Sequence, residues 1–206
     1  MRVVVFGAGG HGKVALECCR SNYPNAEIVV ADDREERWGS EFSGHPVIGG
    51  RATVSTDFVG WSFHVAVGEN RTRGALFALF KLAGLTPLTL VHPSAIVSVS
   101  AGIGAGTLVM PRVVINAGAR IGEDCILNTG AIVEHDCEIG DHAHLSPGTV
   151  LGGGVHVGPF AHVGLGAVIL PGAEVGEGAM VGAGAVVLRR VEAGARVVGV
   201  PARELR

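Results

Sequence analysis

This chain of 206 residues is poor in several residue types, and each scarcity excludes a class of protein. The net charge of -3 lacks the basic surplus with which proteins grip nucleic acid, so we expect no nucleic-acid partner. No apolar run approaches the roughly 18 to 20 residues of a membrane span, so we expect no membrane segment. The apolar start MRVVVFGAGG is short and broken by glycine, which favours a first strand over a signal peptide.

Cysteine and aromatic residues are also scarce. The four cysteines show neither the paired spacing of metal ligands nor a secretory pattern, which favours a cytoplasmic protein. Aromatic residues make up only 5% of the chain, whereas glycine occurs 33 times. This profile predicts a core built mainly from small and aliphatic residues, with glycine at regular turns.

The second half of the chain is organised by a repeat of six residues. From Val97 to Val187 every sixth residue is aliphatic, sixteen in succession, and a small or β-branched residue stands two positions before each. A period of six fits neither a helix nor a plain strand, but it is typical of a hexapeptide β-helix. Three faces close one coil of about 18 residues, so the repeats predict about five coils.

This register assigns several polar residues. Cys125 and Cys137 fall on the small inward position, so we interpret them as packing residues. Residues 18 apart lie above one another, which stacks His144 below His162 and places His156 beside the acids of its own column. His142 is expected at a corner, facing solvent.

The first ninety residues follow a different pattern. Buried-type strands are predicted at 2–6, 26–32 and 63–68, helices after the glycine turn and at 69–84, and a last strand at 88–91. Strand, glycine turn, helix and strand form half of a doubly wound nucleotide-binding unit. We therefore predict an α/β Rossmann-like half domain at 1–88 and an all-β β-helix domain at 89–206.

The turn after the first strand satisfies G-x-G-x-x-G with Gly7, Gly9 and Gly12, and Asp32 follows 20 residues later. About 90 residues provide one mononucleotide half, so a single nucleotide or nucleotide-sugar fits better than NAD. Asp32 or Asp33 would accept hydrogen bonds from the base or ribose. Two alternatives stay open: the glycines only make a tight turn, or the chain is an NAD-dependent enzyme.

His135 stands apart from the other histidines. One coil below and above it lie Ala117 and Gly153, and an acid flanks it on each side. An imidazole oriented by a carboxylate has the parts of a general base. The backbone N–H of Gly153 would be available to stabilise an oxyanion.

A metal site needs three or four ligands that converge on one point. His135 and His144 are nine residues apart, which is one and a half faces, so within one chain they point in different directions. They would approach each other only across a subunit contact. We therefore expect no metal.

Five motifs of this sequence together resemble the bacterial sugar O- and N-acetyltransferases, which include sialic-acid O-acetyltransferases and UDP-4-amino-sugar N-acetyltransferases. These motifs are GAGGHGK, the Asp-Asp pair, VHPSA, NTGAIVEHDC and GVPAR. The resemblance implies a left-handed parallel β-helix and a homotrimer. It also implies acetyl-CoA in the groove between neighbouring prisms and a nucleotide-sugar on the N-terminal domain.

The resemblance further implies residue roles. The catalytic base falls on His135, assisted by Asp136, although related enzymes often carry glutamate there, which leaves Glu134 as a substitute. The implied coenzyme contacts are His144, Leu165 and Ala183. The implied nucleotide-sugar contacts are Gly9, Gly10, His11, Asp32, Asp33 and Gly68.

These observations predict an acetyl-CoA-dependent N-acetyltransferase acting on a nucleotide-linked amino sugar. His135 and Asp136 would remove the proton from the acceptor amine, Gly153 would stabilise the oxyanion, and both substrates would meet in a ternary complex. One alternative is O-acetylation of a sugar hydroxyl. Another is a non-catalytic trimer that only binds a nucleotide-sugar.

Overall fold

The computed structural model describes residues 1–205 and contains two compact units, Met1–Leu90 and Val91–Arg206. Among the described residues, no helix is both long and apolar enough to cross a bilayer.

The first unit is built on a parallel four-stranded sheet in the order β2-β1-β5-β6. Its strands are β1 (Arg2–Phe6), β2 (Glu27–Ala31), β5 (Ser62–Val65) and β6 (Thr86–Pro87). The last four residues of β1 and of β2 are buried, as their continuous aliphatic runs predict for a sheet covered on both faces. The strand predicted at 88–91 is wrong in detail, because pairing occurs at 86–87 and again at 90–91.

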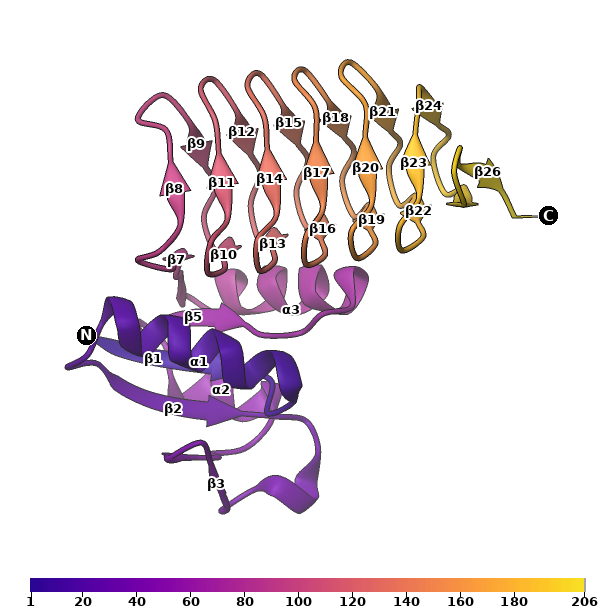
Figure 1. Ribbon diagram of the computed structural model, residues 1–206. Coiled ribbons are helices and arrows are strands. Elements are labelled where there is room, and N and C mark those ends of the chain that lie inside the picture. The colour runs from indigo at the N-terminus through magenta and orange to yellow at the C-terminus, as the bar shows by residue number, and fades with distance from the viewer. Residues whose placement is uncertain (206) are drawn as a thin grey trace. The chain divides into compact units, whose positions relative to one another are not determined.

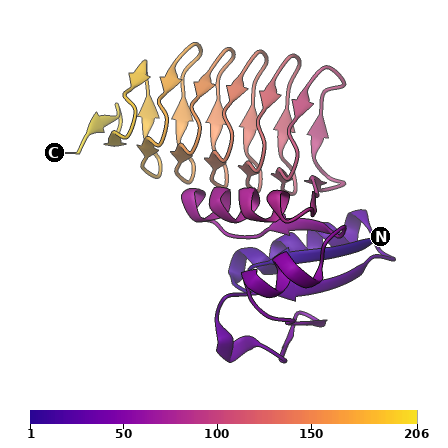
Figure 2. The same ribbon diagram turned by 180° about the vertical axis from the view of Figure 1, so that it is seen from behind.

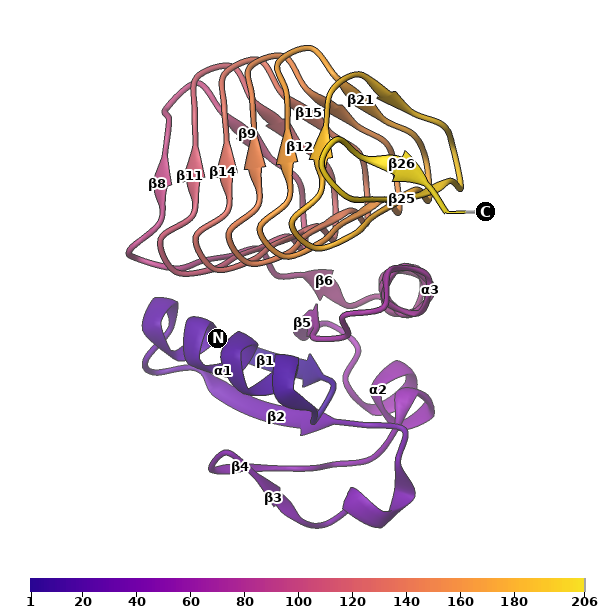
Figure 3. The same ribbon diagram turned by 45° about the vertical axis from the view of Figure 1, so that its right-hand side comes forward.

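Helices cover both faces of this sheet (Figures 1 and 3). They are α1 (Gly10–Asn22), α2 (Arg51–Asp57) and α3 (Asn70–Leu82), with a short 3-10 helix η1 (Glu35–Arg37) and a hairpin of β3 (Glu41–Phe42) and β4 (His45–Pro46). One core cluster joins α2, through Val54, and α3, through Phe77 and Phe80, to the sheet. Phe63 and Phe80 pack edge to face there, with ring centroids 5.5 Å apart.

The second unit is a triangular coil whose repeats each supply a two- or three-residue strand (Figures 2 and 3). The first face consists of β7 (Leu90–Val91), β10 (Leu108–Val109), β13 (Ile126–Leu127), β16 (His144–Leu145), β19 (His162–Val163), β22 (Met180–Val181), β25 (Arg196–Val198) and β26 (Arg203–Glu204). The second face consists of β8 (Ile96–Val97), β11 (Val114–Ile115), β14 (Ile132–Val133), β17 (Val150–Leu151), β20 (Val168–Ile169) and β23 (Val186–Val187). The third face consists of β9 (Gly102–Ile103), β12 (Arg120–Ile121), β15 (Glu138–Ile139), β18 (His156–Val157), β21 (Glu174–Val175) and β24 (Arg190–Val191).

The predicted 18-residue stacking is confirmed by the strand pairs, for example His144 beside His162 and Glu138 beside His156. The prediction of about five coils is wrong, because the coil makes about six turns. The aliphatic hexads end at Val187, and the next buried inner residues are Val191 and Val197, so the last turn is shortened and lies outside the six-residue count. The coil begins at β7, one repeat before Val97 and within the predicted 89–206 domain.

Small side chains and glycine let the turns of the coil stack closely. Cys125 and Cys137 are 1% and 0% exposed, which confirms them as packing residues. A Cβ atom at Gly140 would lie 2.5 Å from the backbone nitrogen of Pro159, one turn above. A side chain at that position would therefore displace the next turn.

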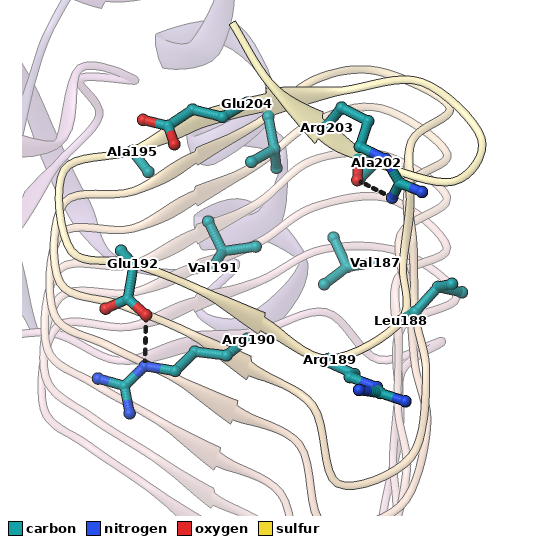
Figure 4. A pocket seen from close by; sticks show the side chains of 11 residues that line it. Val187, Leu188, Arg189, Arg190, Val191, Glu192, Ala195, Ala202, Arg203 and Glu204 are labelled. Carbon is teal, nitrogen blue, oxygen red and sulfur yellow. Dashed lines mark hydrogen bonds and ion pairs between the residues drawn. The ribbon is translucent and has the colours of Figure 1, made fainter.

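The C-terminal end of the coil holds a pocket of about 480 Å³, closed on one side by β25 and β26 (Figure 4). Core residues such as Val187 and Val191 form its floor, and charged side chains such as Arg190 and Glu192 form its rim. None of the predicted site residues lines it.

Candidate active site

His135 and Asp136 form a hydrogen-bonded pair at the corner between the second and third faces of the coil. His135 Nδ1 lies 2.9 Å from Asp136 Oδ2, and both side chains are well exposed. The pair lies in the turn between β14 and β15, after Glu134, so the turn itself presents it to solvent.

The local backbone explains why aspartate stands at this corner. Asp136 has a φ of 58°, in the left-handed region that glycine, asparagine and aspartate adopt most readily. Glutamate is less suited to that conformation. An aspartate at this position is therefore consistent with the geometry, and Asp136 is the acid that accepts the hydrogen bond from the imidazole.

Two glycines make room for the pair. A Cβ atom at Gly118 would lie 2.7 Å from Asp136 Oδ1, and one at Gly153 would lie 2.5 Å from His135 Nε2. The imidazole edge thus rests directly over the Gly153 backbone. Among residues 1–205 we find no hydrogen bond donated by the Gly153 N–H, whereas its carbonyl accepts one from Gly172.

The electrostatics of the pair suit a base. The hydrogen bond that His135 Nδ1–H donates to Asp136, aided by the charges of Asp136 and Glu134, raises the pKa of His135 above its usual value. With Nδ1 engaged by the carboxylate, Nε2 is the nitrogen left to accept a proton.

His144 lies on the first face and is 9% exposed. Its ring stacks on His162 with centroids 4.7 Å apart and an interplanar angle of 7°. The sequence did not indicate the polar neighbours of these two stacked histidines. The side-chain amide of Asn128 lies 3.3 Å from His144 Nε2, and the Ser146 hydroxyl lies 2.8 Å from His162 Nε2. The 16-residue separation of each pair could have suggested them, since it joins adjacent turns of one face.

Leu165 and Ala183 lie one above the other at the corner between the first and second faces, and both are exposed, Leu165 by 60%. His135 occupies the opposite edge of the second face. The structure therefore brings His144, Leu165 and Ala183 to one side of the coil and does not bring them to His135 within one chain.

The other titratable groups of the coil are paired as follows. The exposed His156 lies 3.5 Å from Glu138, which confirms the expected acid and histidine column. The expectation that His142 faces solvent is wrong: its side chain is 17% exposed, because it bonds to the buried Asp124 at 2.8 Å and stacks on Phe160. No group of three or more His, Cys, Asp or Glu residues within 1–205 has the geometry to hold a metal ion.

The glycine turn of the first unit is open. Gly9 caps α1 without a side-chain hydrogen bond, and neither Gly9 nor Gly10 has an atom within 4 Å of where a Cβ would stand. Gly68, after β5, is equally open. Exposed N–H groups at the start of a 13-residue helix are suited to a phosphate.

His11 follows this turn and is neutral at ordinary pH. Its burial, together with the charge of Arg73, lowers its pKa to about 4. A neutral imidazole can position a substrate by hydrogen bonding, but it would not supply a positive charge to a phosphate.

Asp32 and Asp33 are both held in place by arginines. Asp32 accepts hydrogen bonds from the Ala8 N–H at 2.7 Å and from the backbone and side chain of Arg34. The Arg34 hydrogen bonds above all hold the pKa of Asp32 well below its usual range. Asp33 pairs with Arg51, whose backbone N–H lies 3.0 Å from Asp33 Oδ1.

Family comparisons agree with both units. Residues 2–80 match the PglD N-terminal domain model, and residues 120–153 match the bacterial transferase hexapeptide (six repeats) model. The chain is 41% identical over 108 residues to UDP-N-acetylbacillosamine N-acetyltransferase of Bacillus subtilis, a match that covers 50% of this chain and 49% of that protein. The aligned part thus spans about half the length of this curated relative.

Solved structures match over the whole length. A perosamine N-acetyltransferase from Caulobacter crescentus, a variant with one histidine replaced by asparagine in complex with CoA and GDP-perosamine, is 36% identical with a TM-score of 0.94, covering 100% of this chain and 97% of that one. The acetyltransferase domain of PglB from Neisseria gonorrhoeae in complex with acetyl coenzyme A is 38% identical with a TM-score of 0.92, covering 99% and 98%. The chain therefore belongs to the PglD-like family of hexapeptide-repeat sugar N-acetyltransferases, acetyl-CoA-dependent enzymes that acetylate the amine of nucleotide-linked sugars.

Proposed function

We propose that this chain transfers the acetyl group of acetyl-CoA to the amine of a nucleotide-linked amino sugar, with His135 as the general base. The observation that carries the proposal is the His135–Asp136 pair, whose Nδ1 is held by the carboxylate while Nε2 remains available at an exposed corner. Because acetyl-CoA is held inside cells, the reaction would be cytoplasmic.

The reaction would proceed by direct transfer. The neutral amine attacks the thioester carbonyl, and His135 Nε2 accepts its proton as the C–N bond forms. The Gly153 N–H would stabilise the oxyanion. Collapse of the intermediate breaks the C–S bond, and the imidazolium returns the proton to the departing thiolate of coenzyme A.

The positions of the predicted residues favour an active site shared between copies of the chain. His135 lies at one edge of the second face, and Leu165 and Ala183 lie at the other, so one prism alone does not assemble base and coenzyme groove. A homotrimer would place the His135 corner of one subunit against the His144, Leu165 and Ala183 side of the next.

The second face itself supports this arrangement. Its outward row is aliphatic on every strand and half-buried or exposed, whereas the outward row of the third face is charged on four of its strands. A row of apolar side chains that nothing covers is typical of a contact surface, whereas a row of charged side chains is typical of a surface that faces water. The aliphatic row consists of Ile96, Val114, Ile132, Val150, Val168 and Val186.

The first unit would bind the nucleotide-sugar. The open turn at Gly9 and Gly10 would accept the phosphates, with His11 and Gly68 beside the glycosyl group and Asp33 near the nucleoside. Asp32 would act mainly by fixing the turn, since its oxygens are occupied by Ala8 and Arg34. Relatives carry GDP- and UDP-linked sugars in their names, so either nucleotide is a candidate.

The test is transfer from acetyl-CoA to a panel of GDP-, UDP-, dTDP- and CMP-linked 4-amino sugars, followed by thiol release and product mass. We expect one nucleotide class to be acetylated on nitrogen. Transfer to the matching hydroxyl sugars instead would support the O-acetylation alternative, and nucleotide-sugar binding without any transfer would support the non-catalytic trimer.

A further inference from the structure

Trp38 is the exposed aromatic side chain nearest in sequence to the predicted nucleotide-binding acids. It follows η1 and is 45% exposed, although a tryptophan usually buries most of its surface. Its indole N–H donates to the Asp32 carbonyl oxygen at 2.8 Å, so the ring is held in one place rather than left free.

The ring is tied to the glycine turn by a short chain of hydrogen bonds. Ala8 N–H donates to the carboxylate of Asp32, and Trp38 donates to the carbonyl of the same residue. A Cβ atom at Gly50 would lie 3.2 Å from Trp38 Cζ2 and 3.1 Å from Asp33 Oδ1. Trp38, Asp33 and the phosphate-binding turn therefore share one edge of the first unit.

Asp32, one of the two acids expected to contact the nucleoside, is not free to accept hydrogen bonds from it. Each oxygen of Asp32 accepts two hydrogen bonds, which uses the acceptor capacity of a carboxylate. Recognition of the base must therefore come from another group. An exposed, immobilised indole beside Asp33 provides a π-face at no further cost of ordering.

We propose that Trp38 is the stacking platform for the nucleobase of the nucleotide-sugar, with Asp33 at the base edge. This rests on the proposed function and deepens it by naming the residue that holds the base. Stacking on an aromatic ring contributes about 1–3 kcal/mol per base, equivalent to roughly 5- to 150-fold in affinity. A purine, with the larger ring, should gain more than a pyrimidine.

The first measurement uses fluorescence, because the chain has only two tryptophans and Trp61 is packed against Phe58 and Arg2. Titration of the full chain with GDP and UDP should quench emission in W61F, which retains Trp38. The same titration of W38F should leave the emission of Trp61 almost unchanged. Quenching that persists in W38F and disappears in W61F would overturn the proposal.

The second measurement separates stacking from loop structure. Calorimetry should show that W38L binds the nucleotide roughly 5- to 150-fold more weakly and that W38F restores most of the affinity, while the KM for acetyl-CoA is the same in both. W38L binding as tightly as the unaltered chain contradicts the stacking role. Equal weakening of W38L and W38F would assign Trp38 a structural role instead.

The outcomes remain distinguishable from failure of the proposed function. If the unaltered chain binds no nucleotide, the proposed function itself fails. If it binds and acetylates a nucleotide-sugar while W38L is unaffected, only the stacking role is lost.

Discussion

The two units of this molecule fill their cores with different kinds of side chain. Nine of the ten aromatic residues lie in the first ninety positions, and only Phe160 lies in the coil. The first unit fills its core with large rings at irregular sequence spacing. The coil repeats small and aliphatic side chains every six residues, so that each packs on a similar residue 18 positions away.

This difference determines how readily functional residues can be recognised in each unit. A regular coil makes every departure from its pattern visible, and His135 with Asp136 is such a departure, at a corner where neighbouring turns carry glycine. In the irregular first unit, no repeat sets off one polar residue from another. The residues proposed to bind the nucleotide-sugar there are distinguished by their hydrogen bonds rather than by register.

The largest expected effect comes from removing the base in the coil. His135→Asn should reduce kcat by about 10²- to 10⁴-fold, because general base catalysis contributes that much, while coenzyme affinity and the unfolding transition stay the same. His156→Asn is the matched control, since His156 also pairs with an acid on an exposed face. Equal losses in both variants would contradict the assignment of His135.

The next prediction contrasts the two cores. Phe80→Ala, in the aromatic cluster of the first unit, should lower the free energy of unfolding by about 3–5 kcal/mol through the cavity it leaves. Ala143→Leu, on a fully buried inner row of the coil, should cost about 1–3 kcal/mol through overpacking. Urea unfolding followed by tryptophan fluorescence reports only on the first unit, and circular dichroism reports on both. A larger cost for Ala143→Leu would reverse the comparison.

A smaller effect concerns the pH dependence of catalysis. Asp136 raises the pKa of His135, and only the neutral imidazole accepts a proton, so activity should fall as the pH drops through that raised pKa. In Asp136→Asn the pKa of His135 should drop, which moves the acid limb of the kcat profile to lower pH and reduces kcat about 10-fold or more. Glu138→Gln is the control. An unshifted acid limb in Asp136→Asn would mean that another group titrates.

The smallest expected effect is a loss of stability of the first unit at acidic pH. Burial, together with the charge of His11, lowers the pKa of His64 in the first unit to about 3. Below pH ~6.5 the unfolded chain therefore binds a proton that the folded unit does not, and stability falls between that pH and about 3. Tryptophan fluorescence should show the first unit losing free energy of unfolding between pH 7 and 5, and His64→Leu should reduce that difference. A difference of the same size in His64→Leu would remove His64 as the cause.

Much of the coil could be predicted from the sequence, and less of the first unit. The inner rows, the 18-residue stacking and the packing role of Cys125 and Cys137 follow from a strict period. The last turn does not follow from that period, because the next inner residue after Val187 is Val191, four residues later instead of six. In the first unit, the strands and the glycine turn were recognisable, but the arginine partners of Asp32 and Asp33 were not.

The sequence by itself determined the class of each unit, the inner and outer positions of the coil, and His135 as the exceptional histidine, because these depend on local spacing and residue chemistry. Only the tertiary structure decided that Asp136 rather than Glu134 bonds the imidazole, since that depends on a left-handed backbone turn over Gly118. It likewise decided that His142 is held by Asp124, that Asp32 is already fully bonded and that Trp38 stands open beside Asp33. The 18-residue period brings Asp124 near His142 and Gly118 near Asp136, but it does not set backbone dihedrals, side-chain orientations or hydrogen bonds, so only the folded chain shows which of these groups bond.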